Sequence, residues 1–165
     1  MKNLKDRDID WAMSESLKEA ELASRIDEVP VGACVLDEAG KLVSSAHNRK
    51  EGVNDPCGHA EILAIRKACE ERGDWRLSDY TLVVTLEPCL MCMGAIWQSR
   101  ISTVVFGAYD SKGGALSLNY NLHKDPRLNH AFKVVGGVKH YECSRILSDF
   151  FKQKRKGYRF KNSQK

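Results

Sequence analysis

The segment 81–86 is the feature that most constrains the fold of this chain. It reads Thr-Leu-Val-Val-Thr-Leu, a continuous β-branched and apolar run that is typical of a strand buried on both faces. Pro88 follows closely, and a proline can open a helix because the first turn leaves its backbone nitrogen without a partner in any case. A strand that is covered on both faces and followed by a helix indicates helices layered around one sheet, an α/β architecture.

Other segments supply the remaining elements of a layered domain. Three segments are expected to form helices, namely 8–25, 58–71 and 141–154. Four apolar runs are expected to form strands, namely 31–37, 41–46, 102–106 and 132–135. The first two of these flank Glu-Ala-Gly and predict a β-hairpin, whereas the order of the strands in the sheet does not follow from the pattern. The length of 165 residues suits a single domain.

Two short motifs carry candidate metal ligands. His59-Ala-Glu61 lies at the start of one predicted helix, and Pro88-Cys89-Leu-Met-Cys92 lies at the start of the next. Cysteines three positions apart share a helical face, so both sulfurs can reach one ion, and a helix N-terminus favours their thiolate form. With His59 they give three protein ligands. A catalytic zinc takes three because its fourth position stays open for water.

Glu61 is the candidate proton carrier of this site. It follows His59 by two positions, which places it near the metal without making it a necessary ligand. Two thiolates nearly neutralise the charge of zinc, so the metal should acidify water less than a site with three neutral histidines would. Glu61 is therefore expected to accept the proton of the water and to redeliver it to the substrate.

Two other interpretations of the cysteines stay open at this point. A lone Cys-x-x-Cys can be redox-active, although its surroundings here are not thioredoxin-like. A closed structural zinc needs a fourth protein ligand, and Cys57, two residues before His59, is the candidate. The remaining cysteines, Cys34, Cys69 and Cys143, lie in apolar or helical settings and are expected to be core residues.

The charge of the chain is unevenly distributed. Residues 152–165 hold seven of the 26 basic groups and no acidic one, which leaves 19 basic against 22 acidic groups in the rest. Such a tail suits a phosphate backbone, although basic tails can also serve solubility alone. No apolar run is long enough for a membrane span, and residues 1–8 lack the apolar stretch of a secretion signal. Six cysteines without an export signal indicate reduced thiols and a cytoplasmic protein.

The pair His-x-Glu and Pro-Cys-x-x-Cys is the signature of zinc-dependent nucleobase deaminases. Over 8–155 the chain resembles the bacterial tRNA-specific adenosine deaminases, of the cytidine and deoxycytidylate deaminase superfamily. The matching segments are Val29-Pro-Val-Gly-Ala, His47-Asn-Arg, Asp55-Pro, His59-Ala-Glu-Ile, Val84-Thr-Leu-Glu-Pro-Cys-Leu-Met-Cys, Gly94-Ala-Ile, Ser99-Arg-Ile, Val105-Phe-Gly-Ala, Leu128-Asn-His, Val135-Gly-Gly-Val, Glu142-Cys and Leu147-Ser-Asp-Phe-Phe. Cys57-Gly58 and the segment 113–118, which borders the RNA-facing region, depart from the family pattern.

The resemblance implies a three-layer α/β/α cytidine-deaminase-like fold with a mixed five-stranded sheet. The zinc deaminase domain would cover 1–155, and 156–165 would form a basic C-terminal tail. The implied activity is hydrolytic deamination of adenosine to inosine at the wobble position of a tRNA anticodon. It would be carried out by a homodimer with one Zn²⁺ in each subunit.

The same resemblance assigns roles to individual residues. His59, Cys89 and Cys92 would hold zinc, and Glu61 would protonate N1 of adenine and then the departing ammonia. The residues expected to contact the RNA or its flipped base are Asn48, Asp110, Asn129, Phe150 and Phe151. Of these, Asn48 would hydrogen-bond the base, and the two phenylalanines would belong to an RNA-binding terminal helix together with the basic residues after them.

Two other functions share parts of this pattern. A guanine, cytosine or nucleotide deaminase would carry the same zinc signature. A non-catalytic RNA-binding module with a structural zinc would need neither an open metal position nor Glu61. The segment Val84-Thr-Leu-Glu-Pro-Cys, the pair Asn129-His130 and the basic tail favour the tRNA substrate over these alternatives.

Overall fold

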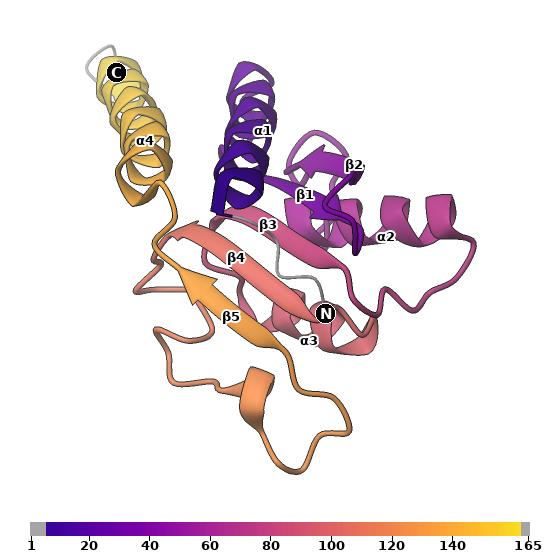
Figure 1. The fold of residues 1–165 in the computed structure, drawn as a ribbon. Helices are drawn as coiled ribbons and strands as arrows, with labels where there is room; N and C mark the ends of the chain where they lie inside the picture. Colours follow the sequence, from indigo (N-terminus) through magenta and orange to yellow (C-terminus); the bar gives the residue numbers. More distant parts are fainter. Residues whose placement is uncertain (1–5, 163–165) are drawn as a thin grey trace.

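The computed structural model describes the backbone of residues 6–162 and the side chains of 8–156 (Figure 1). Its centre is a five-stranded sheet with the order β2-β1-β3-β4-β5. The strands are β1 (Gly32–Leu36), β2 (Leu42–His47), β3 (Thr81–Leu86), β4 (Thr103–Ala108) and β5 (Lys133–Gly136). β1 pairs antiparallel with both β2 and β3, whereas β3, β4 and β5 run parallel. The mixed sheet that the resemblance implied is confirmed.

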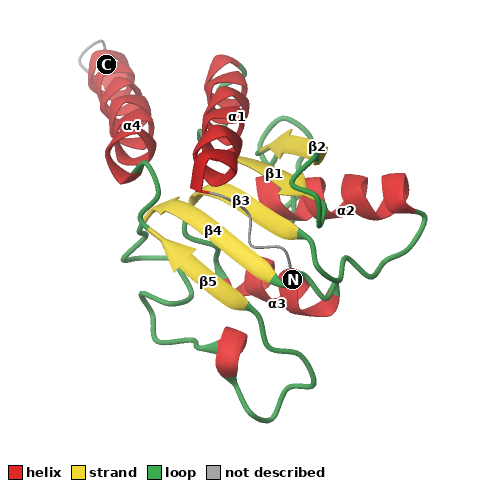
Figure 2. Ribbon diagram, viewed as in Figure 1, coloured by secondary structure: helices red, strands yellow, loops and turns green. Residues whose placement is uncertain are grey.

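Helices cover both faces of the sheet (Figure 2). They are α1 (Asp6–Arg25), α2 (Ala60–Arg72), α3 (Leu90–Gln98) and α4 (His140–Asn162), with a short 3-10 turn η1 (Leu122–Lys124) before β5. Residues of α2 and α3 share one apolar cluster with the sheet, and residues of α1 and α4 share the other. Alternate residues of β3 point into these two clusters, Leu82 and Val84 into the first and Val83 into the second. This explains the uninterrupted apolar run of the strand and confirms the three layers.

The ends of the helices differ from the sequence expectations for local reasons. α3 begins at Leu90 rather than at Pro88, because Cys89 is extended and forms a β-bridge with Gly114. α2 begins at Ala60 rather than at 58, because the backbone of Gly58 bonds to Arg49 and to Asp55 instead of entering the helix.

The terminal helix is longer than expected. It was predicted over 141–154, but α4 continues to Asn162 and so includes residues 156–162 of the predicted basic tail 156–165, whose last three residues lie outside the described part of the chain. No helix in the described part of the chain is long and apolar enough to cross a membrane.

Candidate metal centre

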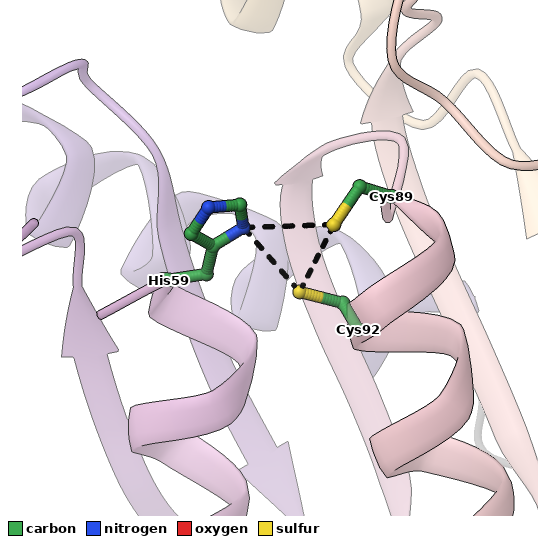
Figure 3. A group of neighbouring side chains, drawn as sticks. All are labelled: His59, Cys89 and Cys92. Carbon is green, nitrogen blue, oxygen red and sulfur yellow. Dashed lines mark hydrogen bonds between the residues drawn. The ribbon is translucent and has the colours of Figure 1, made fainter. Parts of the chain in front are cut away.

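Three side chains from two helix starts meet at one point (Figure 3). His59 is the residue directly before α2, and Cys89 is the residue directly before α3, which contains Cys92 in its first turn. Nδ1 of His59 lies 3.6 Å from Sγ of Cys89 and 3.5 Å from Sγ of Cys92. The two sulfurs are 3.6 Å apart. The prediction that these three residues lie together is confirmed.

The spacing of these donors fits zinc. A tetrahedral zinc with bonds of about 2.05 Å to nitrogen and about 2.3 Å to sulfur holds neighbouring donors about 3.5–3.8 Å apart. The three separations between His59, Cys89 and Cys92 all lie within that range. One imidazole and two thiols are also a donor set that suits zinc, and three protein ligands leave a position open for water.

Protonation of the donors differs between the two cysteines. The hydrogen bond from Cys92, opposed by burial, lowers the pKa of the Cys89 thiol to about 4. The hydrogen bond to Cys89 together with burial raises the pKa of Cys92. Cys89 therefore favours the thiolate form more than Cys92 does, and binding of a metal cation to both sulfurs displaces the thiol proton of Cys92.

Glu61 stands beside this group in the first turn of α2. Its side chain is 4% exposed, and burial raises the pKa of its carboxyl group to about 7. The Cys92 thiol lies close enough to this carboxyl group to offset part of that rise. A buried carboxyl group next to the donors, and outside the donor set itself, is the arrangement expected of a proton carrier.

The structure argues against a closed metal site. Cys57, the candidate fourth ligand, is exposed and does not belong to the donor group. In the described part of the chain, that group contains only the three donors. Of the cysteines expected in the core, Cys34 and Cys143 are buried as predicted, whereas Cys69 is half-buried.

Asn48 directly follows β2 and lies against the start of α2. Its Oδ1 accepts the backbone N–H of Ala60 at 2.9 Å, and its Nδ2 donates to the carbonyl of Val29 at 3.1 Å. One N–H of the amide and one lone pair of Oδ1 remain for another partner. The residue predicted to bind the base is therefore held next to the metal donors.

The two other polar residues expected to contact RNA lie apart from each other. Asp110 follows the C-terminal end of β4, close in sequence to the Gly114 that bridges to Cys89. Asn129 precedes β5, and its Oδ1 accepts a hydrogen bond from Arg100, beyond the far end of α3. β4 and β5 run parallel (Figure 1), so a residue that follows β4 and a residue that precedes β5 lie at opposite ends of these strands. Asp110 is thus on the side of the metal donors, and Asn129 is not.

The two phenylalanines of α4 differ in exposure. Phe150 is 7% exposed and Phe151 is 45% exposed, and their rings meet edge to face with centroids 5.5 Å apart. Lys154 lies over the ring of Phe150 and forms an ion pair with Asp27. Of these two rings, that of Phe151 is the exposed one.

Two buried carboxylates near the site escaped the sequence analysis. Glu28 is 2% exposed and accepts the N–H of Gly52, in the loop between Asn48 and His59. Glu87 is 3% exposed and accepts hydrogen bonds from Asp110 and Ser117. A glutamate near a buried strand is only a weak sequence signal that its carboxylate will bind the N–H groups of a loop. The sequence does not reveal which N–H groups the fold will bring to it.

Comparisons with known proteins agree with this geometry. The family model for the cytidine and deoxycytidylate deaminase zinc-binding region matches residues 6–108. The tRNA-specific adenosine deaminase of Bacillus subtilis (strain 168) is 48% identical over 144 residues, which cover 87% of this chain and 89% of the relative. The enzyme of that name from Streptococcus pyogenes serotype M18 (strain MGAS8232) is 43% identical and covers 93% and 94%.

A solved structure from biochemical and structural studies of A-to-I editing by tRNA:A34 deaminases superimposes with a TM-score of 0.79. It is 41% identical in sequence and covers 83% of this chain and 99% of its own. The fold, the zinc-type donor group and these similarities lead to one conclusion: the chain belongs to the tRNA-specific adenosine deaminases, a family of zinc-dependent deaminases.

Proposed function

We propose that the protein hydrolytically deaminates adenosine to inosine at the wobble position of a tRNA anticodon. The observation that carries this proposal is the donor group of His59, Cys89 and Cys92, 3.5–3.6 Å apart, with the buried carboxyl group of Glu61 beside it. The choice of adenosine in tRNA rests on the relatives that bear this activity in their names.

The residues of the site divide the work of this reaction. His59, Cys89 and Cys92 would hold one Zn²⁺, which supplies a water acidified enough to act as a nucleophile at neutral pH. Glu61 accepts one proton of the attacking water and delivers it to N1 of adenine; it then takes the proton of the hydroxyl group added at C6 and passes it to the amino group, which leaves as ammonia. Asn48 offers its free N–H and lone pair to the edge of the base.

An RNA substrate explains features that a free base would not require. An anticodon base is already single-stranded, so moving it into a pocket costs little. The last part of α4 and the residues after it carry basic groups without acidic ones, and Phe151 exposes an aromatic ring beside them. Basic groups next to an exposed ring suit a phosphate backbone and stacked bases.

We further propose that the active form is a homodimer that works in the cytoplasm, where tRNA is used. Asn129 lies at the end of the strands away from the metal donors of its own chain. If it contacts RNA near the target base, a second subunit is the simplest way to bring it there. Light scattering of the zinc-loaded protein tests the dimer, and a monomeric active enzyme would contradict it.

The decisive experiment is single-turnover deamination of an arginine-tRNA anticodon stem-loop, with inosine read by mass. Wild-type protein should form inosine, and guanine and cytosine should release no ammonia. Glu61→Gln should keep one zinc per subunit and lose turnover by about 10²–10⁴-fold, because the proton carrier is gone. Glu71→Gln, on the exposed part of the same helix, is the matched control and should remain active.

Activity on guanine without inosine formation would favour a free-base deaminase. An unchanged rate in Glu61→Gln would leave the proton role of that residue without support, and would favour the non-catalytic alternative if wild type were also inactive.

A further inference from the structure

Glu87 is a buried carboxylate that lies between the metal donors and the segment 110–117. It follows β3 directly and precedes the donor Cys89 by two residues. Its side chain is 3% exposed. The ion pairs of the described residues do not include it, so its charge is met by hydrogen bonds from neutral groups.

All three hydrogen bonds to the Glu87 side chain come from that segment. Oε2 accepts the backbone N–H of Asp110 at 3.0 Å and the hydroxyl of Ser117 at 2.6 Å. Oε1 accepts the backbone N–H of Ser117 at 2.7 Å. One carboxylate therefore holds both ends of the segment, and hydrogen bonds to a charged acceptor are stronger than those between neutral groups.

The backbone around Glu87 continues the same connection. The N–H of Glu87 donates to the carbonyl of Ala108 at 2.8 Å, and the carbonyl of Pro88 accepts the N–H of Ala115 at 2.9 Å. Cys89 and Gly114 form an antiparallel β-bridge. The segment thus runs along the strand end that carries the metal donor.

Gly114 fits its position because of Glu87. A Cβ atom at Gly114 would lie 2.3 Å from Cδ of Glu87 and 2.5 Å from each carboxylate oxygen. Such contacts are far inside van der Waals distance, so any side chain there would displace the carboxylate. Gly114 leaves room for the Glu87 carboxylate, and Ser117 donates hydrogen bonds to it. Both residues lie in 113–118, the segment that departs from the family pattern.

We propose that Glu87 is a positioning residue that holds Asp110 at a fixed position relative to the metal donors. The side chain that contacts the RNA then keeps a constant distance and orientation to the reacting centre. The inference rests on the proposed function, in which Asp110 contacts RNA near the target base. A carboxylate suits the task because all three partners are donors and both of its oxygens are acceptors. Glutamine keeps the size but turns one acceptor into a donor, which then opposes the N–H of either Asp110 or Ser117.

A double-mutant cycle tests this role. Zinc-loaded wild type, Glu87→Gln, Asp110→Ala and the double variant are compared for kcat and KM on the anticodon stem-loop, well below each melting temperature. Glu87→Gln should keep one zinc per subunit and raise KM about tenfold with a smaller change in kcat. In the Asp110→Ala background, the same change should alter KM less than about twofold, because the side chain that Glu87 positions is absent.

Ser117→Ala provides a milder variant that removes one of the three hydrogen bonds and leaves the charge in place. It should raise KM less than Glu87→Gln does, and its effect should also vanish in the Asp110→Ala background. If Glu87→Gln does not fold, the comparison of Ser117→Ala in the wild-type and Asp110→Ala backgrounds still tests the inference.

Several results would overturn the inference: full additivity of Glu87 and Asp110, zinc loss in Glu87→Gln, or a lowered melting temperature without any change in KM. Failure of the proposed function is a separate result, since wild type would then form no inosine from the stem-loop.

Discussion

Asn48 and Ala60 are joined by a hydrogen bond of 2.9 Å from the backbone N–H of Ala60 to Oδ1 of Asn48. Ala60 is the first residue of α2 and directly follows the metal donor His59, whose own side chain makes no capping hydrogen bond. The first N–H groups of a helix have no partner within it. Asn48 therefore supplies the cap that His59, turned toward the metal, does not provide.

Asn48 caps α2 and also faces the expected position of the base, so Asn48→Ala should reduce both stability and activity. Loss of the cap and of the bond to the Val29 carbonyl should lower the free energy of unfolding by about 1–2 kcal/mol. Loss of the group that faces the base should lower kcat/KM on the stem-loop by more than this destabilisation explains. Denaturant unfolding and single-turnover assays measure the two effects.

Asn48→Asp is the control for this prediction. It keeps an acceptor for Ala60 but has no donor for the Val29 carbonyl, so the helix cap should survive while the loop contact is lost. If Asn48→Ala were as active and as stable as wild type, neither use of Asn48 would stand.

Zinc content separates the donor cysteines from the other thiols. Cys92→Ala should reduce bound zinc well below one per subunit, because two donors hold the ion poorly, and should abolish inosine formation. Cys57→Ser should keep full zinc content and activity, because that thiol is exposed and lies outside the donor group. Zinc per subunit, measured by atomic emission, decides the matter, and zinc loss in Cys57→Ser would restore the closed site.

Removing the metal should destabilise the fold. The donors come from the starts of two helices, α2 and α3, so a bound ion links two elements that are distant in sequence. A ligand that binds only the folded state stabilises it in proportion to the logarithm of its concentration over Kd. Chelation should therefore lower the melting temperature, and added zinc should restore it. Identical melting curves with and without chelator would contradict a metal at this place.

Glu28 gives a pH dependence with a defined sign. Burial alone would raise the pKa of its carboxyl group, but the backbone N–H groups of Gly52, Glu51 and Lys50, together with the charge of Arg49, outweigh burial and lower that pKa below its ordinary value of 4.5. A carboxyl group whose pKa is lower in the folded state stabilises the fold fully above its unfolded pKa, and loses that contribution as pH falls through the folded one.

The free energy of unfolding of wild type should thus fall more steeply below pH 4.5 than that of Glu28→Gln, which cannot titrate. Parallel pH profiles for the two proteins would show that Glu28 contributes nothing of this kind. Because the zinc donors are the same in both proteins, loss of metal in acid affects them alike and does not enter the difference.

The buried strand and the donor group could be predicted from sequence, because each depends on local chemistry. The apolar run 81–86 is the observed β3 residue for residue. The spacing of Cys89 and Cys92 indicates the start of one helix, and the motif that contains His59 indicates the start of a second helix. That the two starts meet followed from the deaminase resemblance, since nothing in local spacing brings them together.

What sequence could not provide concerns long-range partners. Glu87 and Ser117 are 30 residues apart, and only the folded chain shows that they bond. Asn129 was expected near the target base, but motif order does not say at which end of the strands a loop lies. The exposure of Phe150 likewise depended on how α4 packs, because neighbouring phenylalanines look alike in sequence.

Gly114→Ala tests whether the position of the Glu87 carboxylate matters, without changing Glu87 itself. The new Cβ would lie 2.3 Å from Cδ of Glu87, so the carboxylate must move and its bonds to Asp110 and Ser117 must lengthen or break. Overpacking of this kind costs about 1–3 kcal/mol. The variant should bind zinc and raise KM for the stem-loop as Glu87→Gln does.

Gly52→Ala, whose Cβ would meet only an ordinary contact at 3.5 Å, should keep KM within about twofold of wild type. A Gly114→Ala enzyme with wild-type KM would mean that the position of the carboxylate does not matter for RNA.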